Sequence, residues 1–312
     1  MPSQEPGPGA DPDAPGPDTP GPDLERAEEV FRGVRGRLFG IAYRVLGSAT
    51  EAEDVLQEAW IRWQTYDRST VREPEAFLAT TVTRLAINVA RSARARHESY
   101  VGPWLPEPVD TAADPALGAE RGAVLEIAVL MLLERLTPTE RAAYVLREAF
   151  DYPYDRISEI IGQTAANTRQ LVSRARRHVA RERRAGVEAA QQKRLLTAFV
   201  DAARKGDLSA LEELLADDVV SYSDGGGAVR ASKFPVVGRE RVAKYVRAFA
   251  DRFWEGVAVE EVRANGAAAV RLSRDGEVFA VVTVAASEEG IDRVLWLMNP
   301  AKLGGFAASA ES

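Results

Sequence analysis

The sequence predicts a multidomain chain in which two all-α units precede an α+β unit. Apolar residues recur at helical spacing through residues 24–97 and again through residues 117–186. Helical patterns followed by several short β-like runs occupy residues 190–305, an order typical of an α+β domain. A chain of 312 residues is long enough for three such units.

The composition excludes several classes of protein. The chain is 46% hydrophobic and 28% charged, which is ordinary for a soluble globular protein. Cysteine is absent, so disulfides, thiol nucleophiles and zinc ribbons are excluded, and a reducing cytoplasm fits. No apolar run approaches the roughly 18 residues that a membrane span needs. We therefore expect a cytoplasmic protein with no membrane contact, no metal and no cofactor.

Charge is unevenly distributed along the chain. Residues 1–23 are rich in Pro, Gly and Asp and lack the apolar core of a signal peptide, so we expect a disordered acidic tail. A short second tail is expected at residues 306–312. The net charge is −7, yet arginines crowd residues 84–96 and 169–184. Phosphate contact depends on such local fields rather than on the chain average.

Residues 24–97 predict three helices. One face of the first helix carries Leu38, Ile41, Val45 and Leu46. Gly47 suits the end of that helix, and Ser48 with Glu51 predicts a capping box at the start of the next. Pro74 stands where a third helix can begin.

A proline-rich linker, residues 98–116, separates the two helical units. It holds several prolines and cannot form a continuous helix. Trp104 lies between Pro103 and Pro106, and we expect its ring to dock onto a neighbouring unit rather than stay exposed. After the linker, Leu117–Arg135 predicts a long apolar helix.

A helix-turn-helix is predicted next. Thr137, Pro138 and Glu140 are strong start signals for one helix, and Gly162 ends the short helix that follows it. The last helix runs from Ala165 to Arg181. In a helix-turn-helix the second helix enters the major groove.

Helical spacing sorts the side chains of that last helix into two faces. The inward face consists of Thr168, Leu171, Val172, Ala175 and Val179. Arg, Gln and Asn can pair with base edges, while the more C-terminal arginines lie nearer phosphates. A solvated basic face is the alternative reading. The outward residues expected to bind duplex DNA are Asn167, Arg169, Gln170, Ser173, Arg174, Arg176 and Arg177.

Two long segments carry a family resemblance. RLTPTERAAYVLREAFDYPYDRISEIIGQTAANTRQLVSRARRHV resembles region 4 of bacterial sigma-70 factors of the extracytoplasmic-function group, and RLFGIAYRVLGSATEAEDVLQEAWIRW resembles their region 2. The resemblance implies a region 2 helical bundle and a region 4 helix-turn-helix. It also implies a monomer that binds core RNA polymerase, through its β′ coiled coil and β flap, and promoter DNA at the −35 duplex and melted −10 elements.

The resemblance also implies residue roles in region 2. The polymerase-docking residues would be Asp54, Gln57, Glu58, Trp60, Ile61 and Trp63, although either tryptophan could instead be core. The −10 strand would be bound by Arg84, Asn88, Arg91 and Arg94. Many relatives have Asp where Asn88 stands, and Thr168 replaces a usual valine.

The last unit is similar to SnoaL-like domains of the nuclear-transport-factor-2-like superfamily, which form a cone with an internal pocket. Its subgroup marks are WLPEPV, DGGGAV and NPAKL, with Ala228 in place of Lys and Ala301 in place of Asp. The resemblance implies that this domain regulates the sigma factor in cis. The implied contact residues are Trp104, Leu105, Pro106, Glu107, Asp224, Gly225, Gly226, Gly227, Asn299, Pro300, Lys302 and Leu303.

Other functions remain open at this point. His97 and His178 lie outside the last unit, so an enzyme there would need Asp or Glu as its acid–base group, with Asp224 the best candidate. A turn or interdomain role is favoured for Asp224, and we expect no enzyme. A small molecule in the pocket stays possible. The alternative for the whole chain is a ligand-sensing DNA-binding regulator, or an isomerase or cyclase fused to a helix-turn-helix.

Overall fold

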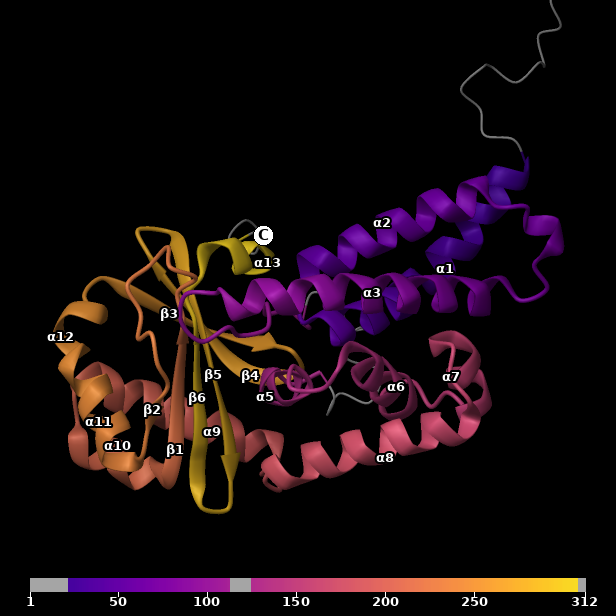
Figure 1. The fold of residues 1–312 in the computed structure, drawn as a ribbon. Helices are drawn as coiled ribbons and strands as arrows, with labels where there is room; N and C mark the ends of the chain where they lie inside the picture. Colours follow the sequence, from indigo (N-terminus) through magenta and orange to yellow (C-terminus); the bar gives the residue numbers. More distant parts are fainter. Residues whose placement is uncertain (1–21, 113–124, 308–312) are drawn as a thin grey trace, which may run out of the picture.

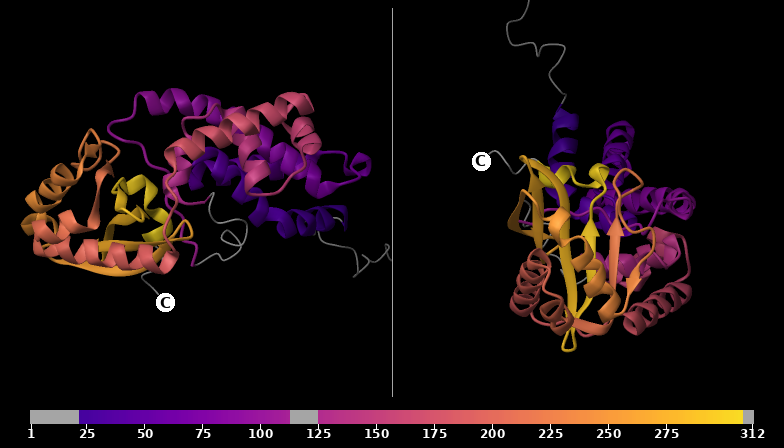
Figure 2. Two further views of the ribbon diagram at one scale, coloured as in Figure 1. Left: turned by 90° about the horizontal axis from the view of Figure 1, so that it is seen from below. Right: turned by 90° about the vertical axis from the view of Figure 1, so that its left-hand side faces the viewer.

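The computed structural model describes residues 22–112 and 125–307. The predicted tails therefore lie almost wholly outside the described residues, as do residues 113–124. Two sets of helices lie together at one end of the molecule, and a sheet with its own helices forms the other end (Figure 1). The view from below in Figure 2 shows the same division.

The first helical unit confirms the three predicted helices. Gly47 adopts a left-handed φ of 70° and ends the first helix. Ser48 Oγ accepts a hydrogen bond from the Glu51 amide at 3.2 Å, which caps the second helix. The helix start lies inside the predicted tail. The elements are α1 (Pro22–Leu46), α2 (Ala49–Thr65), the short 3₁₀ helix η1 (Arg68–Thr70) and α3 (Pro74–Glu98).

The second helical unit has the predicted helix-turn-helix. Thr137 and Glu140 form a full capping box, and Gly162 ends a helix with a left-handed φ of 66°. Thr164 Oγ1 caps the last helix by accepting from the Asn167 amide. The elements are α5 (Ile127–Leu133), α6 (Pro138–Glu148), α7 (Tyr154–Ile161) and α8 (Ala165–Glu182).

The prediction of one long helix over Leu117–Arg135 is wrong within the described residues. Helix α5 spans only Ile127–Leu133, and residues 117–124 lie outside the description. Glu126 has extended backbone and precedes the helix, and the chain must turn after Leu133 because Pro138 opens a new helix. Nearly every side chain of α5 is buried, since the helix lies between the helical core and the sheet.

The C-terminal unit is a sheet covered by helices. The strands are ordered β2-β1-β6-β5-β4-β3. Neighbouring strands are antiparallel as expected, except that β1 and β6 pair in parallel. The elements are α9 (Ala189–Lys205), α10 (Leu208–Leu214), β1 (Leu215–Asp224), β2 (Val236–Val237), α11 (Arg239–Ala248), α12 (Ala250–Phe253), β3 (Val257–Ala264), β4 (Ala267–Arg274), β5 (Glu277–Ser287), β6 (Gly290–Leu297), η3 (Pro300–Lys302) and α13 (Gly304–Ala307).

The end of this unit corrects a predicted boundary. A tail was expected from residue 306, but Phe306 lies in α13 and is fully buried. Its ring packs with Leu303 and Leu297 in the core beneath the linker. The domain therefore extends at least to α13, because this aromatic side chain completes that core.

Both faces of the sheet are apolar, because alternate side chains of a strand point to opposite faces. On β6, Val294 and Trp296 belong to the core shared with α9 and α11. Leu295 and Leu297 belong to a second core on the opposite face, shared with Leu105 of the linker and with α5. The linker and α5 are thus docked onto the back of the sheet.

The two helical units share one continuous core. Arg141 of α6 is buried and donates to the Val45 carbonyl at the end of α1 at 2.8 Å. Arg84 of α3 donates to the carbonyls of Ile160 and Glu159 in α7 at 2.8 and 2.9 Å. This closed arrangement brings α3 directly against the helix-turn-helix. Within the described residues, no helix is both long and apolar enough to cross a membrane.

Candidate nucleic-acid interface and linker clamp

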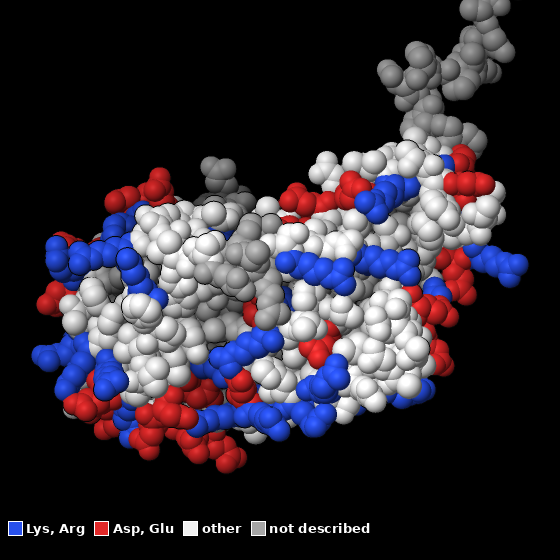
Figure 3. All heavy atoms as spheres, in the orientation of Figure 1, with Lys and Arg blue, Asp and Glu red and all other residues white. Residues whose placement is uncertain are grey.

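Helix α8 presents the basic face that its spacing predicts. The predicted inward residues are all buried. Asn167 is half-buried, while the other predicted DNA-binding side chains of α8 are exposed. Figure 3 shows Lys and Arg side chains along α8 and along α3 on the same face of the molecule. The two helices can therefore present positive charge to one side.

Neighbouring carboxylates hold two arginines of this face. Arg174 Nε lies 3.1 Å from Glu140, and an Arg176 guanidinium nitrogen lies 2.7 Å from Glu148. Burial raises the pKa of Glu140, but hydrogen bonds from Thr137 and Arg174 outweigh it and set the pKa below its usual value. Glu140 thus caps α6 and orients Arg174 at the same time.

The four predicted −10 residues of α3 differ in their environments. Asn88 and Arg91 are exposed, with 3.4 Å between Arg91 Nη1 and Asn88 Oδ1. The Arg84 guanidinium is occupied by the α7 carbonyls. Arg94 lies in α3, but its side chain is outside the described residues. Asn88 and Arg91 are thus the two described members of this set that are exposed and make no hydrogen bond to α7.

Helix α2 carries the predicted polymerase-docking stripe. Asp54, Gln57 and Ile61 are exposed, and Glu58 pairs with Arg62 at 2.7 Å. Trp60 is half-buried against Phe31, with ring centroids 5.1 Å apart. Trp63 instead lies in the core, 2% exposed, and its Nε1 donates to the Ala27 carbonyl. Trp63 therefore offers a partner no surface, as the alternative reading of the two tryptophans allowed.

The three subgroup marks meet around one carboxylate. Asp224 is 1% exposed and lies at the end of β1. Its Oδ1 accepts from the Tyr100 hydroxyl at 2.6 Å, and its Oδ2 accepts from the Leu105 amide at 2.9 Å and from Lys302 Nζ at 2.7 Å. We call these residues, with Trp104 and Asn299, the linker clamp.

Lys302 contacts both the linker and the Asp224 carboxylate. Its Nζ donates to the Leu105 carbonyl at 2.5 Å and lies 4.3 Å from the centroid of the Trp104 ring. Burial lowers the pKa of Lys302 even though Asp224 faces it. Because burying such a pair costs desolvation, the pair adds little net stability.

Gly226 and Asn299 explain the glycine turn. Gly226 has a left-handed φ of 59°, and a Cβ there would lie 2.3 Å from Asn299 Nδ2. That amide nitrogen donates to the Tyr100 hydroxyl at 2.7 Å. A Cβ on Gly225 would lie 2.7 Å from the Val229 carbonyl oxygen, and Gly227 lies beside Val101 of the linker.

The remaining predicted contact residues differ in burial. Pro106 and Leu303 are buried, whereas Pro300 is exposed. The substituted positions Ala228 and Ala301 are exposed as well.

Glu107 joins the linker to helix α2. Its Oε2 accepts from the Thr50 amide at 3.1 Å and from Ser48 Oγ at 2.9 Å. Its own amide donates to the Gly47 carbonyl. A carboxylate at this position satisfies free N–H groups at the positive end of the helix. The linker therefore caps the helix that carries the predicted polymerase-docking stripe.

The sequence did not reveal the role of Asn265. It is fully buried in the β3–β4 turn, with a left-handed φ of 55°. Its Oδ1 accepts from the Val109 amide at 3.0 Å, and its Nδ2 donates to the Tyr43 hydroxyl at 2.6 Å and to the Leu125 carbonyl at 2.9 Å. One amide thus joins all three units. In the sequence, Asn265 followed by Gly266 is typical of a hairpin turn, and this local pattern gives no indication of the distant partners.

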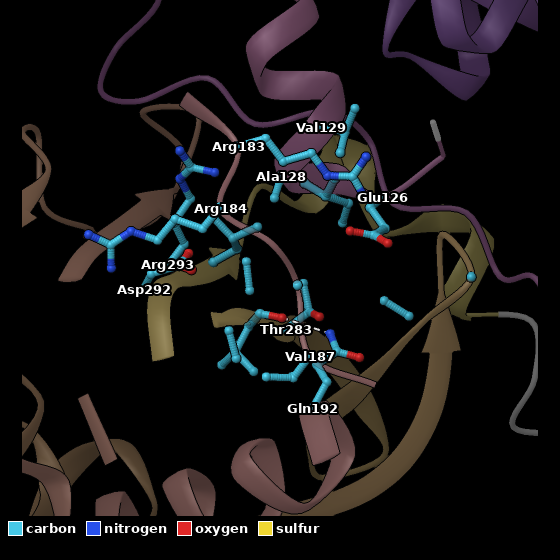
Figure 4. A pocket seen from close by; sticks show the side chains of 18 of the residues that line it. Glu126, Ala128, Val129, Arg183, Arg184, Val187, Gln192, Thr283, Asp292 and Arg293 are labelled. Atoms are coloured by element: carbon cyan, nitrogen blue, oxygen red, sulfur yellow. Dashed lines mark hydrogen bonds between the residues drawn. The ribbon is translucent and has the colours of Figure 1, made fainter. Parts of the chain in front are cut away.

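A cavity of about 240 Å³ lies where the second helical unit meets the sheet. Figure 4 shows Arg183 pointing toward Glu126 across it, with Asp292 and Arg293 together on another wall. Burial raises the pKa of Glu126, which Arg183 opposes, and burial likewise raises the pKa of Asp292. The described residues contain no cluster of metal-ligating side chains.

Family models match three parts of the chain. They are Sigma-70 region 2 over residues 30–96, Sigma-70 region 4 over residues 126–179 and a SnoaL-like domain over residues 196–292. These ranges fall within the predicted units and follow the same order. The matches include most of α3, most of α8 and most of the sheet unit.

Two curated proteins and one solved structure are similar to the chain. The ECF RNA polymerase sigma factor SigJ of Mycobacterium tuberculosis H37Rv is 34% identical over 232 residues, 73% of this chain and 74% of that protein. The probable ECF RNA polymerase sigma factor SigI of strain CDC 1551 is 34% identical over 68% of this chain and 73% of that protein. The crystal structure of SigJ matches with a TM-score of 0.73 at 28% identity, over 89% of this chain and 98% of that chain.

Proposed function

This chain belongs to the extracytoplasmic-function sigma factors of bacterial RNA polymerase, and we propose that its SnoaL-like domain restrains it in cis. Sigma factors of this family bind core RNA polymerase and direct transcription initiation at promoters. The restraint would act by holding regions 2 and 4 in the closed arrangement. The observation that carries the proposal is the buried Asp224 carboxylate, which binds the backbone of the linker between the two regions.

The distance between promoter elements supports a restraint. The −10 and −35 elements are named for positions that lie about 25 base pairs apart, or about 85 Å of duplex at 3.4 Å per step. In the closed arrangement the two DNA-reading units touch, since Arg84 of α3 is hydrogen-bonded to α7. In this state the two units cannot bind the −10 and −35 elements at the same time. Promoter binding would therefore require that region 4 move away from region 2.

Several contacts oppose that movement. Asp224 and Lys302 hold the linker at Leu105, Glu107 fastens it to α2, and Asn265 binds it at Val109. A linker fixed at successive points cannot extend between separating domains. Releasing it would break the hydrogen bonds that Asp224 and Lys302 make to Leu105, and this loss opposes the movement.

Residue roles follow within this proposal. The exposed side chains of α8 would read the −35 duplex, and Asn88 and Arg91 would bind the −10 strand together with Arg94 and Arg84. Arg84 becomes available only after α7 moves. The exposed stripe of α2 around Ile61 would dock on the β′ coiled coil, and region 4 on the β flap, with the protein acting as a cytoplasmic monomer.

We further propose that the SnoaL-like domain is not an enzyme. Both histidines of the chain, His97 and His178, lie outside it. Asp224, the best candidate for an acid–base residue, accepts from Tyr100, Leu105, Lys302 and the Gly226 amide and has almost no exposed surface. A carboxylate so fully occupied has no lone pair directed at a substrate.

Run-off transcription with core polymerase on the protein's own upstream region tests the restraint. Asp224→Asn and Lys302→Ala weaken the clamp, while Asp217→Asn removes an exposed charge at the other end of the same strand and serves as the control. We expect both clamp variants to reach half-maximal transcription at lower sigma concentration and the control to match the parent. Lower or unchanged transcription with stoichiometric polymerase binding would overturn the restraint.

A further inference from the structure

A second cavity, of about 550 Å³, opens in the SnoaL-like domain on the face of the sheet opposite the linker. It lies among β1, β6, α11, α12 and the loop after β1. This volume is in the usual range of sites for small organic molecules. Its aromatic lining consists of Tyr245, Phe249, Phe253, Trp254, Phe279 and Trp296.

The aromatic wall suits a flat apolar body. Phe253 meets Phe279 and Trp296 edge to face, with both centroid distances 5.6 Å. Trp296 Nε1 already donates to Ser221 Oγ, so the indole adds apolar surface rather than a free donor. Phe249 stands at the cavity and is 49% exposed, which leaves an aromatic edge available to an incoming ring.

The charged residues of the cavity are all arginines. Among its described lining residues there is no Asp or Glu, whereas Arg230, Arg252 and Arg274 are present. Arg274 is held by the carbonyls of Phe253 and Glu255 and lies over Phe279. The side chains of Arg230 and Arg252 form no hydrogen bond or ion pair with any described residue. Figure 3 shows basic side chains gathered at the end of the molecule that carries α12.

We propose that this cavity binds an amphipathic anion, a molecule with an aromatic body and one acidic group. The body would lie against Phe253 and Trp296, and the acidic group would pair with Arg252 and Arg230. Guanidinium groups form strong bidentate hydrogen bonds with carboxylate and sulfonate oxygens. A neutral or cationic molecule of the same shape would leave this positive field uncompensated.

The cavity and the linker clamp share backbone. Ser223 lines the cavity, and the next residue, Asp224, holds the linker. Met298 also lines the cavity, and its amide donates to the Asp224 carbonyl at 2.8 Å. A ligand that shifts this wall therefore acts on the clamp. This coupling rests on the proposed cis restraint, whereas binding itself does not.

Anilinonaphthalene sulfonate, an anionic aromatic fluorophore, tests the site on the full-length protein. We expect saturable binding of one equivalent, and about tenfold weaker binding to Arg252→Ala and Arg230→Ala because each loses a charge-assisted hydrogen bond. Arg247→Ala, an exposed arginine of α11 outside the cavity lining, is the matched control and should bind as the parent does.

Specificity for an anion is tested with neutral N-phenylnaphthylamine, which has a similar aromatic body. We expect it to bind more weakly than the sulfonate and to be insensitive to the arginine substitutions. Equal binding of the two probes, or sulfonate binding unchanged by Arg252→Ala and Arg230→Ala, would overturn the site.

The coupling has a separate readout. Limited proteolysis of the linker, with and without saturating probe, should change in the parent and not in Asp224→Asn, whose clamp is already weakened. Probe binding without a change in cleavage would overturn the coupling, but it would not contradict the proposed binding site. A failure of the cis restraint in transcription would leave probe binding unaffected, so the two proposals fail independently.

Discussion

Asn265 occupies a turn position that few residues tolerate, and it uses its whole amide to join the units. Asn adopts left-handed backbone more readily than other non-glycine residues. Its side chain offers both a donor and an acceptor. Here the acceptor binds the linker and the donor binds regions 2 and 4. The residue that suits this local turn thus also makes hydrogen bonds to segments far apart in the sequence.

Replacing Asn265 by Gly should destabilise the protein through the lost amide alone, because Gly keeps the left-handed backbone. The buried Val109 amide would lose its acceptor, so we expect the free energy of unfolding in urea to fall by about 2 kcal/mol. Asp275→Gly is the matched control, since Asp275 has the same backbone in the exposed β4–β5 turn. An equal loss in both variants would assign the effect to the turn backbone.

At the scale of elements, local signals predicted most helices and few of the long-range pairings. Thr137, Pro138 and Gly162 mark helix ends through contacts within a few residues, and the structure has those ends. The predicted extent of α5 was wrong because a run of apolar residues indicates that the segment is buried on all sides and does not indicate how long the helix is. The parallel β1–β6 pair and the partners of Asn265 depend on segments far apart in sequence, which periodicity does not encode.

The recognition helix gives a prediction at this scale. Glu140 holds Arg174 on the outer face of α8, at 3.1 Å, so this guanidinium is oriented before DNA arrives. Arg174→Ala should weaken binding to a −35 duplex about tenfold, in line with the 1–3 kcal/mol of a base contact. Fluorescence anisotropy with the promoter duplex and a scrambled duplex measures this. An equal loss on both would identify a phosphate contact instead of base recognition.

The whole molecule depends on a sheet that is apolar on both faces. One face carries the domain's own helices and the aromatic cavity, and the other carries the linker and α5. Because successive residues of β1 point to opposite faces, Ser223 and Asp224 connect the cavity to the linker clamp across a single strand. Under the proposed cis restraint, a small shift of this one strand would be enough for the appended domain to act on regions 2 and 4.

The cavity between region 4 and the sheet predicts how pH affects the closed arrangement. Burial raises the pKa of Glu126 and of Asp292 in the folded protein, against the opposing charges of Arg183, Arg184 and Arg293. Between the unfolded and folded pKa values the folded protein binds more protons, so its stability falls as pH rises through that interval. The penalty of burying two charged carboxylates is absent below the unfolded values and fully present above the raised ones.

A double variant, Glu126→Gln with Asp292→Asn, removes both ionisable groups while keeping their shapes. Its free energy of unfolding relative to the parent should increase as pH rises above about 4, the ordinary range of these carboxyls, because the parent alone acquires the buried charges. Glu75→Gln, an exposed carboxyl of α3, is the control and should follow the parent across this range. Urea midpoints measured at each pH give the comparison. A constant difference between the double variant and the parent would mean that folding changes the pKa of neither carboxyl, which would contradict the prediction.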